Sequence, residues 1–168
     1  MNEQDILISG VGRKLVFLGH AADMISASLS STYTNNTEYA IHIMARGAVF
    51  YQGKQFTSTE EIFEHKTGHE KSVFEEKTEK LLSIETDFVL QEIAYDSCYC
   101  LSLIFNHELV IRSFYNNFSK PDDEQWRVFF PWKAENSLVC KGGGIELEQS
   151  DYSQEELDRI RFLLHHKA

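Results

Sequence analysis

The stretch that decides the fold is residues 98–115, which read CYCLSLIFNHELVIRSFY. Two runs, 98–105 and 108–115, are rich in apolar and aromatic residues and are separated only by Asn106 and His107. Runs of this composition predict β-strands, and a polar connection of two residues predicts a tight hairpin, although the usual glycine is missing. The sequence therefore predicts an antiparallel pair of strands here.

Further strands are expected on both sides of this hairpin. The runs 39–45 and 48–51 flank Arg46 and Gly47, a pattern that predicts a second tight hairpin. A run of three glycines at 142–144 predicts a tight turn that ends the strand region. The other expected strands cover residues 13–18, 24–30, 86–94, 125–130 and 137–141. Because these strands follow one another without alternating helices, a doubly wound parallel sheet is disfavoured.

Two short helices are expected, over about 73–83 and 154–166. Each begins at a serine followed three residues later by a glutamate, which is the capping-box spacing. Four apolar side chains of the second helix are expected to face inward, namely Leu157, Ile160, Leu163 and Leu164. The sequence thus predicts one α+β domain over residues 1–168, with a mainly antiparallel, curved β-sheet and these two helices.

The net charge of −10 is concentrated in one part of the chain. Residues 59–96 contain eleven acidic and four basic residues, whereas residues 1–58 contain equal numbers of each. A nucleic-acid partner is disfavoured, because phosphate binding requires a basic face. The acidity would suit a basic protein partner, with Glu60, Glu61 and Glu64 as candidate contacts. The alternative is that it only keeps the surface soluble.

The cysteines and histidines give no complete metal site. Cys98 and Cys100 are expected on one face of a strand, and with Cys140 they make three thiols, too few for a tetrahedral zinc site. His65 and His69 have helical spacing, but a glycine interrupts them. We therefore expect no metal and no cofactor. An odd number of cysteines behind a polar N-terminus predicts a cytoplasmic protein, and no apolar run is long enough to span a membrane.

Aromatic residues gather between 114 and 132. In EQWRVFFPW (124–132), strand alternation puts Trp126 and Arg127 on opposite faces, each with aromatic neighbours. Such a strand is either covered on both sides or lines a groove on one side. Trp132 follows the strand, and a partly exposed tryptophan near an arginine is typical of a recognition surface. Core packing explains the earlier aromatic residues.

A catalytic alternative rests on three residues. His20 precedes Asp23 by three positions, and His42 lies in a strand between apolar neighbours. An imidazole close to a carboxylate could act as an acid–base pair near neutral pH. No nucleophile elbow, P-loop or dinucleotide fingerprint occurs in the sequence.

Three segments carry a resemblance to a known family. They are GHAADM (19–24), EYAIHIMARGAVF (38–50) and EQWRVFFP (124–131). Together they resemble small uncharacterised bacterial proteins whose blocks read approximately RAADM, EYxLHxQCxWR and ExWRxF. The matching positions are Glu38, Tyr39, His42, Glu124, Trp126 and Arg127, whereas His20, Met44, Ala45, Gly47 and Ala48 depart from the pattern. The resemblance implies a bacterial source and assigns no activity.

The sequence thus leads to three hypotheses, in this order of preference. The first is a non-catalytic, immunity-like domain whose acidic surface masks a basic protein, with a homodimer through a strand edge also open. The second is a small-molecule-binding protein with an aromatic pocket. The third is a hydrolase or metal-dependent enzyme using His20, Asp23 and His42. The candidate binding residues are His42, Trp126, Arg127, Trp132, Glu60, Glu61 and Glu64.

Overall fold

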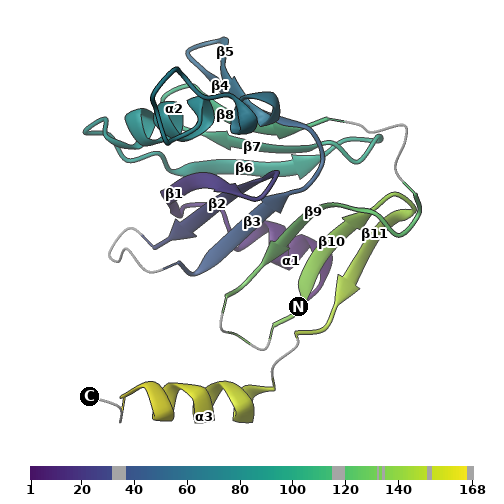
Figure 1. Ribbon diagram of the computed structural model, residues 1–168. Coiled ribbons are helices and arrows are strands. Elements are labelled where there is room, and N and C mark those ends of the chain that lie inside the picture. The colour runs from purple at the N-terminus through teal and green to yellow at the C-terminus, as the bar shows by residue number, and fades with distance from the viewer. Residues whose placement is uncertain (32–36, 115–119, 132, 134, 151–152, 166–168) are drawn as a thin grey trace.

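The computed structural model describes residues 1–31, 37–114, 120–131, 133, 135–150 and 153–165. Within these residues the chain forms eleven strands in two antiparallel sheets, three α-helices and one 3₁₀ turn (Figure 1). The α+β class and the antiparallel pairing predicted from the sequence are confirmed. The strands are divided between a six-stranded and a five-stranded sheet.

The six-stranded sheet is built from segments that are far apart in the sequence. Its order is β1 (Lys14–Ala21), β2 (Met24–Ser30), β3 (Tyr39–Ile43), β9 (Glu124–Phe129), β10 (Ser137–Lys141) and β11 (Gly144–Glu148). The central pairing joins β3 to β9, so that His42 lies opposite Arg127. The predicted tight turn after residue 141 is confirmed, but β11 follows it, and the strand region therefore continues beyond the glycines.

The five-stranded sheet contains the hairpin predicted over residues 98–115. Its order is β5 (Lys54–Ser58), β4 (Gly47–Tyr51), β8 (Leu109–Ser113), β7 (Leu101–Phe105) and β6 (Leu90–Tyr95). The pairing of β7 with β8 confirms that hairpin. Its turn lies one residue later than expected, because His107 and Glu108 take the left-handed conformation, with φ of 55° and 60°. Cys98 and Cys100 precede β7, so the prediction that they share a strand face is wrong.

The predicted hairpin at Arg46 and Gly47 is also wrong. Here the chain crosses from one sheet to the other, because β3 pairs with β2 and β9 while β4 pairs with β5 and β8. The backbone N–H groups of Met44 and Ala45 both donate to the Gln125 carbonyl, each at 2.9 Å. The Arg46 carbonyl accepts from the N–H of Phe114 at 2.8 Å. The crossover backbone is therefore paired on both sides.

Both predicted helices are present, and a third precedes them. α2 (Val73–Leu82) begins at a complete capping box of Ser72 and Glu75. α3 (Gln154–His165) ends where the described residues end, short of the predicted residue 166. α1 (Glu3–Ile8) was not expected, and it is capped by Asn2. η1 is a 3₁₀ turn over Thr59–Phe63.

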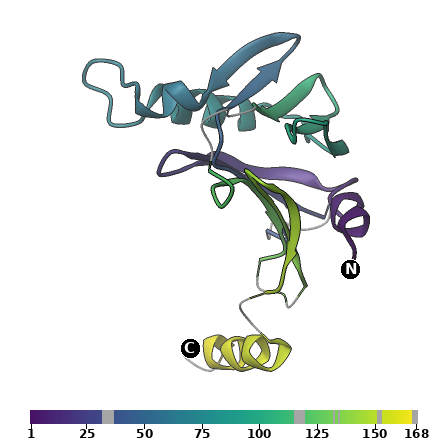
Figure 2. The same ribbon diagram turned by 90° about the vertical axis from the view of Figure 1, so that its right-hand side faces the viewer.

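The core lies between the two sheets, which Figure 2 shows as separate layers. Backbone bonds from Leu15 N to Phe88 O (2.7 Å) and from Leu90 N to Arg13 O (2.8 Å) join the sheets along β1. α2 packs on β1 and β5, and α1 contacts β6, β9 and β10. Both ribbon views show α3 apart from the sheets.

The inward face predicted for α3 is only partly confirmed. Leu157 is buried, but Leu163 is 51% exposed, because the sheets do not cover that part of the helix. The side chain of Leu164 lies outside the described residues.

Candidate functional site

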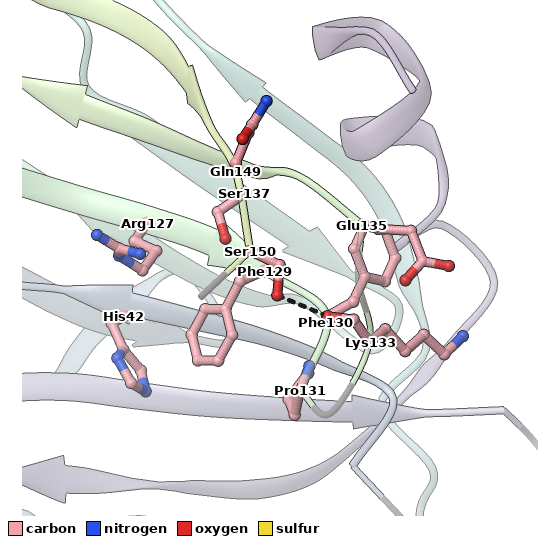
Figure 3. Close-up of a pocket in the computed structure, with 10 residues that line it drawn as sticks. All are labelled: His42, Arg127, Phe129, Phe130, Pro131, Lys133, Glu135, Ser137, Gln149 and Ser150. Carbon is pink, nitrogen blue, oxygen red and sulfur yellow. Dashed lines mark hydrogen bonds between the residues drawn. The ribbon is translucent and has the colours of Figure 1, made fainter. Parts of the chain in front are cut away.

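A hollow of about 400 Å³ opens on the face of the six-stranded sheet opposite to the face that packs in the core. Figure 3 shows the side chains that line it. It lies over β3 and β9 and is bordered by the segment that precedes β10 and the segment that follows β11. Its lining consists of His42, Arg127, Phe129, Phe130, Pro131, Lys133, Glu135, Ser137, Gln149 and Ser150. Its volume falls within the range of small-molecule sites.

Strand alternation decides which residues reach this hollow. In β9, Trp126 and Val128 are fully buried toward the core, whereas Arg127 and Phe129 are half-buried on the opposite face. Side chains of directly paired residues point to the same face of a sheet, so His42 of β3 joins Arg127 there. The structure thus brings together two of the predicted site residues.

The imidazole of His42 forms the inner wall of the hollow. Its ring meets that of Phe129 edge-on, with the ring centroids 4.8 Å apart. Burial lowers the pKa of His42, the Arg127 charge lowers it further, and Glu124 partly opposes both. The ring is therefore held neutral at pH 7, with one nitrogen able to donate a hydrogen bond and the other able to accept one. Neither nitrogen is hydrogen-bonded to another described residue.

Arg127 is already engaged by two carboxylates. Its Nε and Nη2 donate to Glu124 at 2.6 and 3.0 Å, and its Nη2 lies 2.7 Å from Glu148. The hydrogen bond to Glu124 is the main cause that raises the pKa of Arg127. A guanidinium held in this way has little capacity left for a further anion.

The loop before β10 brings charges of both signs to the rim of the hollow. Lys133 and Glu135 are half-buried, and neither forms an ion pair with another described residue. The Lys133 ammonium lies 5.8 Å from the centre of the Phe130 ring, a cation–π contact. The Ser150 hydroxyl donates to the Lys133 carbonyl at 3.0 Å and ties the loop to the end of β11.

The predicted acidic residues meet at a second, polar hollow of about 430 Å³ on the five-stranded sheet. Glu60, Glu61 and Glu64 line it together with Arg46. The Arg46 Nε donates to Glu60 at 2.8 Å. A hydrogen bond from Ser58 is the main cause that lowers the pKa of Glu60.

The remaining carboxylates of this acidic hollow differ in how they are paired. Glu61 forms an ion pair with Lys77 of α2 at 2.7 Å. The exposed carboxylate of Glu64 makes no ion pair within the described residues. Phe63, between these two glutamates in the sequence, is 68% exposed.

The three residues of the catalytic hypothesis are not brought together. The Nε2 of His20 lies 2.8 Å from Glu75 of α2, and its Nδ1 lies 2.9 Å from the Ala22 carbonyl. Asp23 lies in the exposed turn between β1 and β2. His20 pairs with Ile25, which pairs with Ile43, so the His20 side chain points to the face opposite that of His42. The structure gives this trio no shared site.

Two other predicted site residues have different outcomes. Trp126 lies in the core, where its indole N–H donates to the Tyr99 carbonyl at 2.8 Å, so it does not belong to a binding surface. Trp132 lies outside the described residues. Lys133, Glu135 and Ser137 were not predicted, because no local sequence pattern marks them as site residues. The described residues contain no cluster of metal ligands.

Comparison with known proteins adds no family. No protein-family model, curated protein sequence or solved structure matches the chain. Among the helices of the described residues, none has the length and apolar character needed to cross a bilayer. Any functional argument therefore rests on the residues and geometry of the two hollows.

Proposed function

We propose that this chain is a non-catalytic, immunity-like domain that binds a basic segment of another protein through the acidic hollow of Glu60, Glu61 and Glu64. The observation that carries the proposal is the convergence of these three glutamates on one hollow that the exposed ring of Phe114 also lines. Charged groups steer a partner and set its orientation, while an exposed aromatic ring supplies apolar contact.

Two carboxylates of the hollow already pair with cationic groups of the chain itself. The Arg46 guanidinium and the Lys77 ammonium each form an ion pair with one of its carboxylates. The space therefore suits the side chains that a basic partner would bring, and the unpaired Glu64 is the first carboxylate open to one. The surrounding region 59–96, with its excess of acidic residues, would attract such a partner from a distance.

The proposal includes a cytoplasmic setting in a bacterium. None of the three cysteines forms a disulfide, and thiols stay reduced in the cytoplasm. The acidic surface argues against nucleic acid as the partner. A homodimer through the edge strand β11, where Leu147 is 46% exposed, is compatible with this setting.

Titration with a fluorescent deca-arginine peptide tests the proposal, with Glu64→Lys and Glu85→Lys as matched variants. Both residues are exposed members of the acidic region, and both substitutions change the net charge equally. If the hollow is the site, Glu64→Lys should weaken binding roughly threefold to tenfold more than Glu85→Lys does. Equal losses would mean that only the overall charge attracts the peptide, and an absence of binding at low salt would also contradict the proposal.

A further inference from the structure

The hollow of Figure 3 offers four buried or half-buried polar side chains that the described part of the chain leaves without a hydrogen bond or ion pair. They are His42, Lys133, Glu135 and Ser137. All four are half-buried or buried. Polar groups that are partly removed from water without a partner cost free energy, and a ligand that pairs with them recovers it.

These groups stand at different ends of the hollow. His42 projects from β3 and Ser137 begins β10, so both belong to the sheet. Lys133 and Glu135 belong to the loop, and Figure 3 shows both at the end away from His42. Phe129 and Pro131 supply apolar surface between the ends. A ligand that satisfies this arrangement has an apolar middle, a neutral polar tip and a head that bears both charges.

The electrostatics exclude a strongly anionic ligand. Arg127 is already paired with Glu124 and Glu148, so among the described residues that line the hollow Lys133 is the cation left for a ligand. Glu135 stands on the same rim and would repel a phosphate or a dicarboxylate. One unpaired ammonium together with one unpaired carboxylate matches a zwitterion.

We propose that this hollow binds a free α-amino acid with an aromatic side chain. The ring of the ligand lies against Phe129 and Pro131, where ring contacts and apolar burial stabilise it. The ligand carboxylate faces Lys133 and its ammonium faces Glu135. A hydroxyl or ring N–H at the tip reaches His42, which favours tyrosine or tryptophan over phenylalanine. This site is on a different sheet from the acidic hollow and does not depend on it.

Isothermal titration with L-tyrosine and two analogues tests the head of the ligand. Tyramine lacks the carboxylate, and 3-(4-hydroxyphenyl)propionate lacks the ammonium. We expect saturable binding of one tyrosine per chain and at least twofold to fivefold weaker binding of each analogue, the range of an exposed charge pair. The proposal is overturned if neither tyrosine nor tryptophan binds, or if both analogues bind as tightly as tyrosine.

Two variants assign the charges. Lys133→Ala should weaken tyrosine roughly twofold to fivefold and leave tyramine unchanged, because tyramine has no carboxylate to lose. Glu135→Ala should weaken tyrosine and leave the propionate analogue unchanged. The control is Lys54→Ala, in β5 and remote from the hollow, which should change neither ligand. If Lys133→Ala weakens tyrosine and tyramine equally, the lysine does not bind the carboxylate and the assignment fails.

His42→Ala tests the tip. The substitution should weaken tyrosine binding roughly tenfold, because it removes a hydrogen bond and the ring that lines the inner side of the hollow. It should weaken phenylalanine binding less, because phenylalanine has no group at its tip to form that hydrogen bond. Equal losses for the two amino acids would overturn the role of His42. Thermal unfolding of each variant shows whether it is folded, and deca-arginine binding by the same variants separates this site from the acidic hollow.

Discussion

Replacing Trp126 with phenylalanine tests whether this residue stabilises the core or serves a binding surface. Its side chain is 0% exposed, and its indole nitrogen donates to the Tyr99 carbonyl at 2.8 Å. Leaving that carbonyl without its donor costs about 1–3 kcal/mol. The smaller ring also leaves a void that costs about 1 kcal/mol. We therefore expect the free energy of unfolding to fall by roughly 2–4 kcal/mol.

Urea denaturation followed by circular dichroism measures this change, by linear extrapolation to zero denaturant. Phe129→Leu is the matched control, because Phe129 lies on the opposite, half-buried face of the same strand. It should lower the free energy of unfolding by about 1 kcal/mol and weaken tyrosine binding. The reasoning is refuted if Trp126→Phe changes the free energy of unfolding by less than about 0.5 kcal/mol, the size of an ordinary surface substitution.

Three further predictions concern the turn at β10, the thiols and pH. In urea denaturation, Gly142→Ala should cost about 1–3 kcal/mol of unfolding free energy, because its new methyl would lie 2.2 Å from the Lys120 carbonyl oxygen. Gly143→Ala, with its nearest neighbour at 3.6 Å, should change it by less than about 1 kcal/mol, and equal losses would contradict the close approach. Of the three thiols, only the exposed Cys98 should react rapidly with a disulfide reagent in the native protein; a second fast thiol would contradict the burial of the other two. Folding lowers the pKa of His42, so between that lowered pKa and 6.5 the unfolded chain binds more protons than the folded chain, and the free energy of unfolding falls as the pH falls. Urea denaturation at several pH values should show a smaller fall for His42→Gln than for the unsubstituted protein. The same dependence of stability on pH in both proteins would contradict this prediction.

The sequence predicts most elements of the fold because their patterns are local. The strand expected over 24–30 matches β2 at both ends, and the capping box at Ser72 places the start of α2 correctly. Pairing between distant strands is not local. Nothing in the run 39–45 shows that its partner is β9, because that choice depends on which buried faces meet across the core. α1 is too short for a periodic pattern, although the Asn2–Asp5 capping box was a usable signal.

The candidate site, too, is only partly predictable from local sequence patterns. Residue type singles out His42 and Arg127 one at a time, but their contact follows from the register of β3 against β9. Lys133 and Glu135 reach the rim because the loop between β9 and β10 is tied to the end of β11, a tertiary constraint without a sequence pattern. The residue type of Trp126 suggests a binding surface. Its inward direction follows from the alternation of side chains along β9 and from the burial of its large apolar ring.

Two of the three segments that carry the resemblance, 38–50 and 124–131, meet where β3 pairs with β9, and their side chains point to opposite faces of the sheet. Tyr39 and Trp126 point inward and use their polar atoms on the carbonyls of Ile6 (3.0 Å) and Tyr99 (2.8 Å), so packing explains both. His42 and Arg127 point outward as direct partners. Arg127 is satisfied by its carboxylates, whereas the ring nitrogens of His42 have no hydrogen bond within the described residues, so hydrogen bonding within the chain does not explain this residue. Ligand screening should therefore compare the unsubstituted protein with variants of His42. If a Trp126 variant loses ligand binding only to the extent that it is unfolded, Trp126 acts through stability, and the choice of His42 is supported.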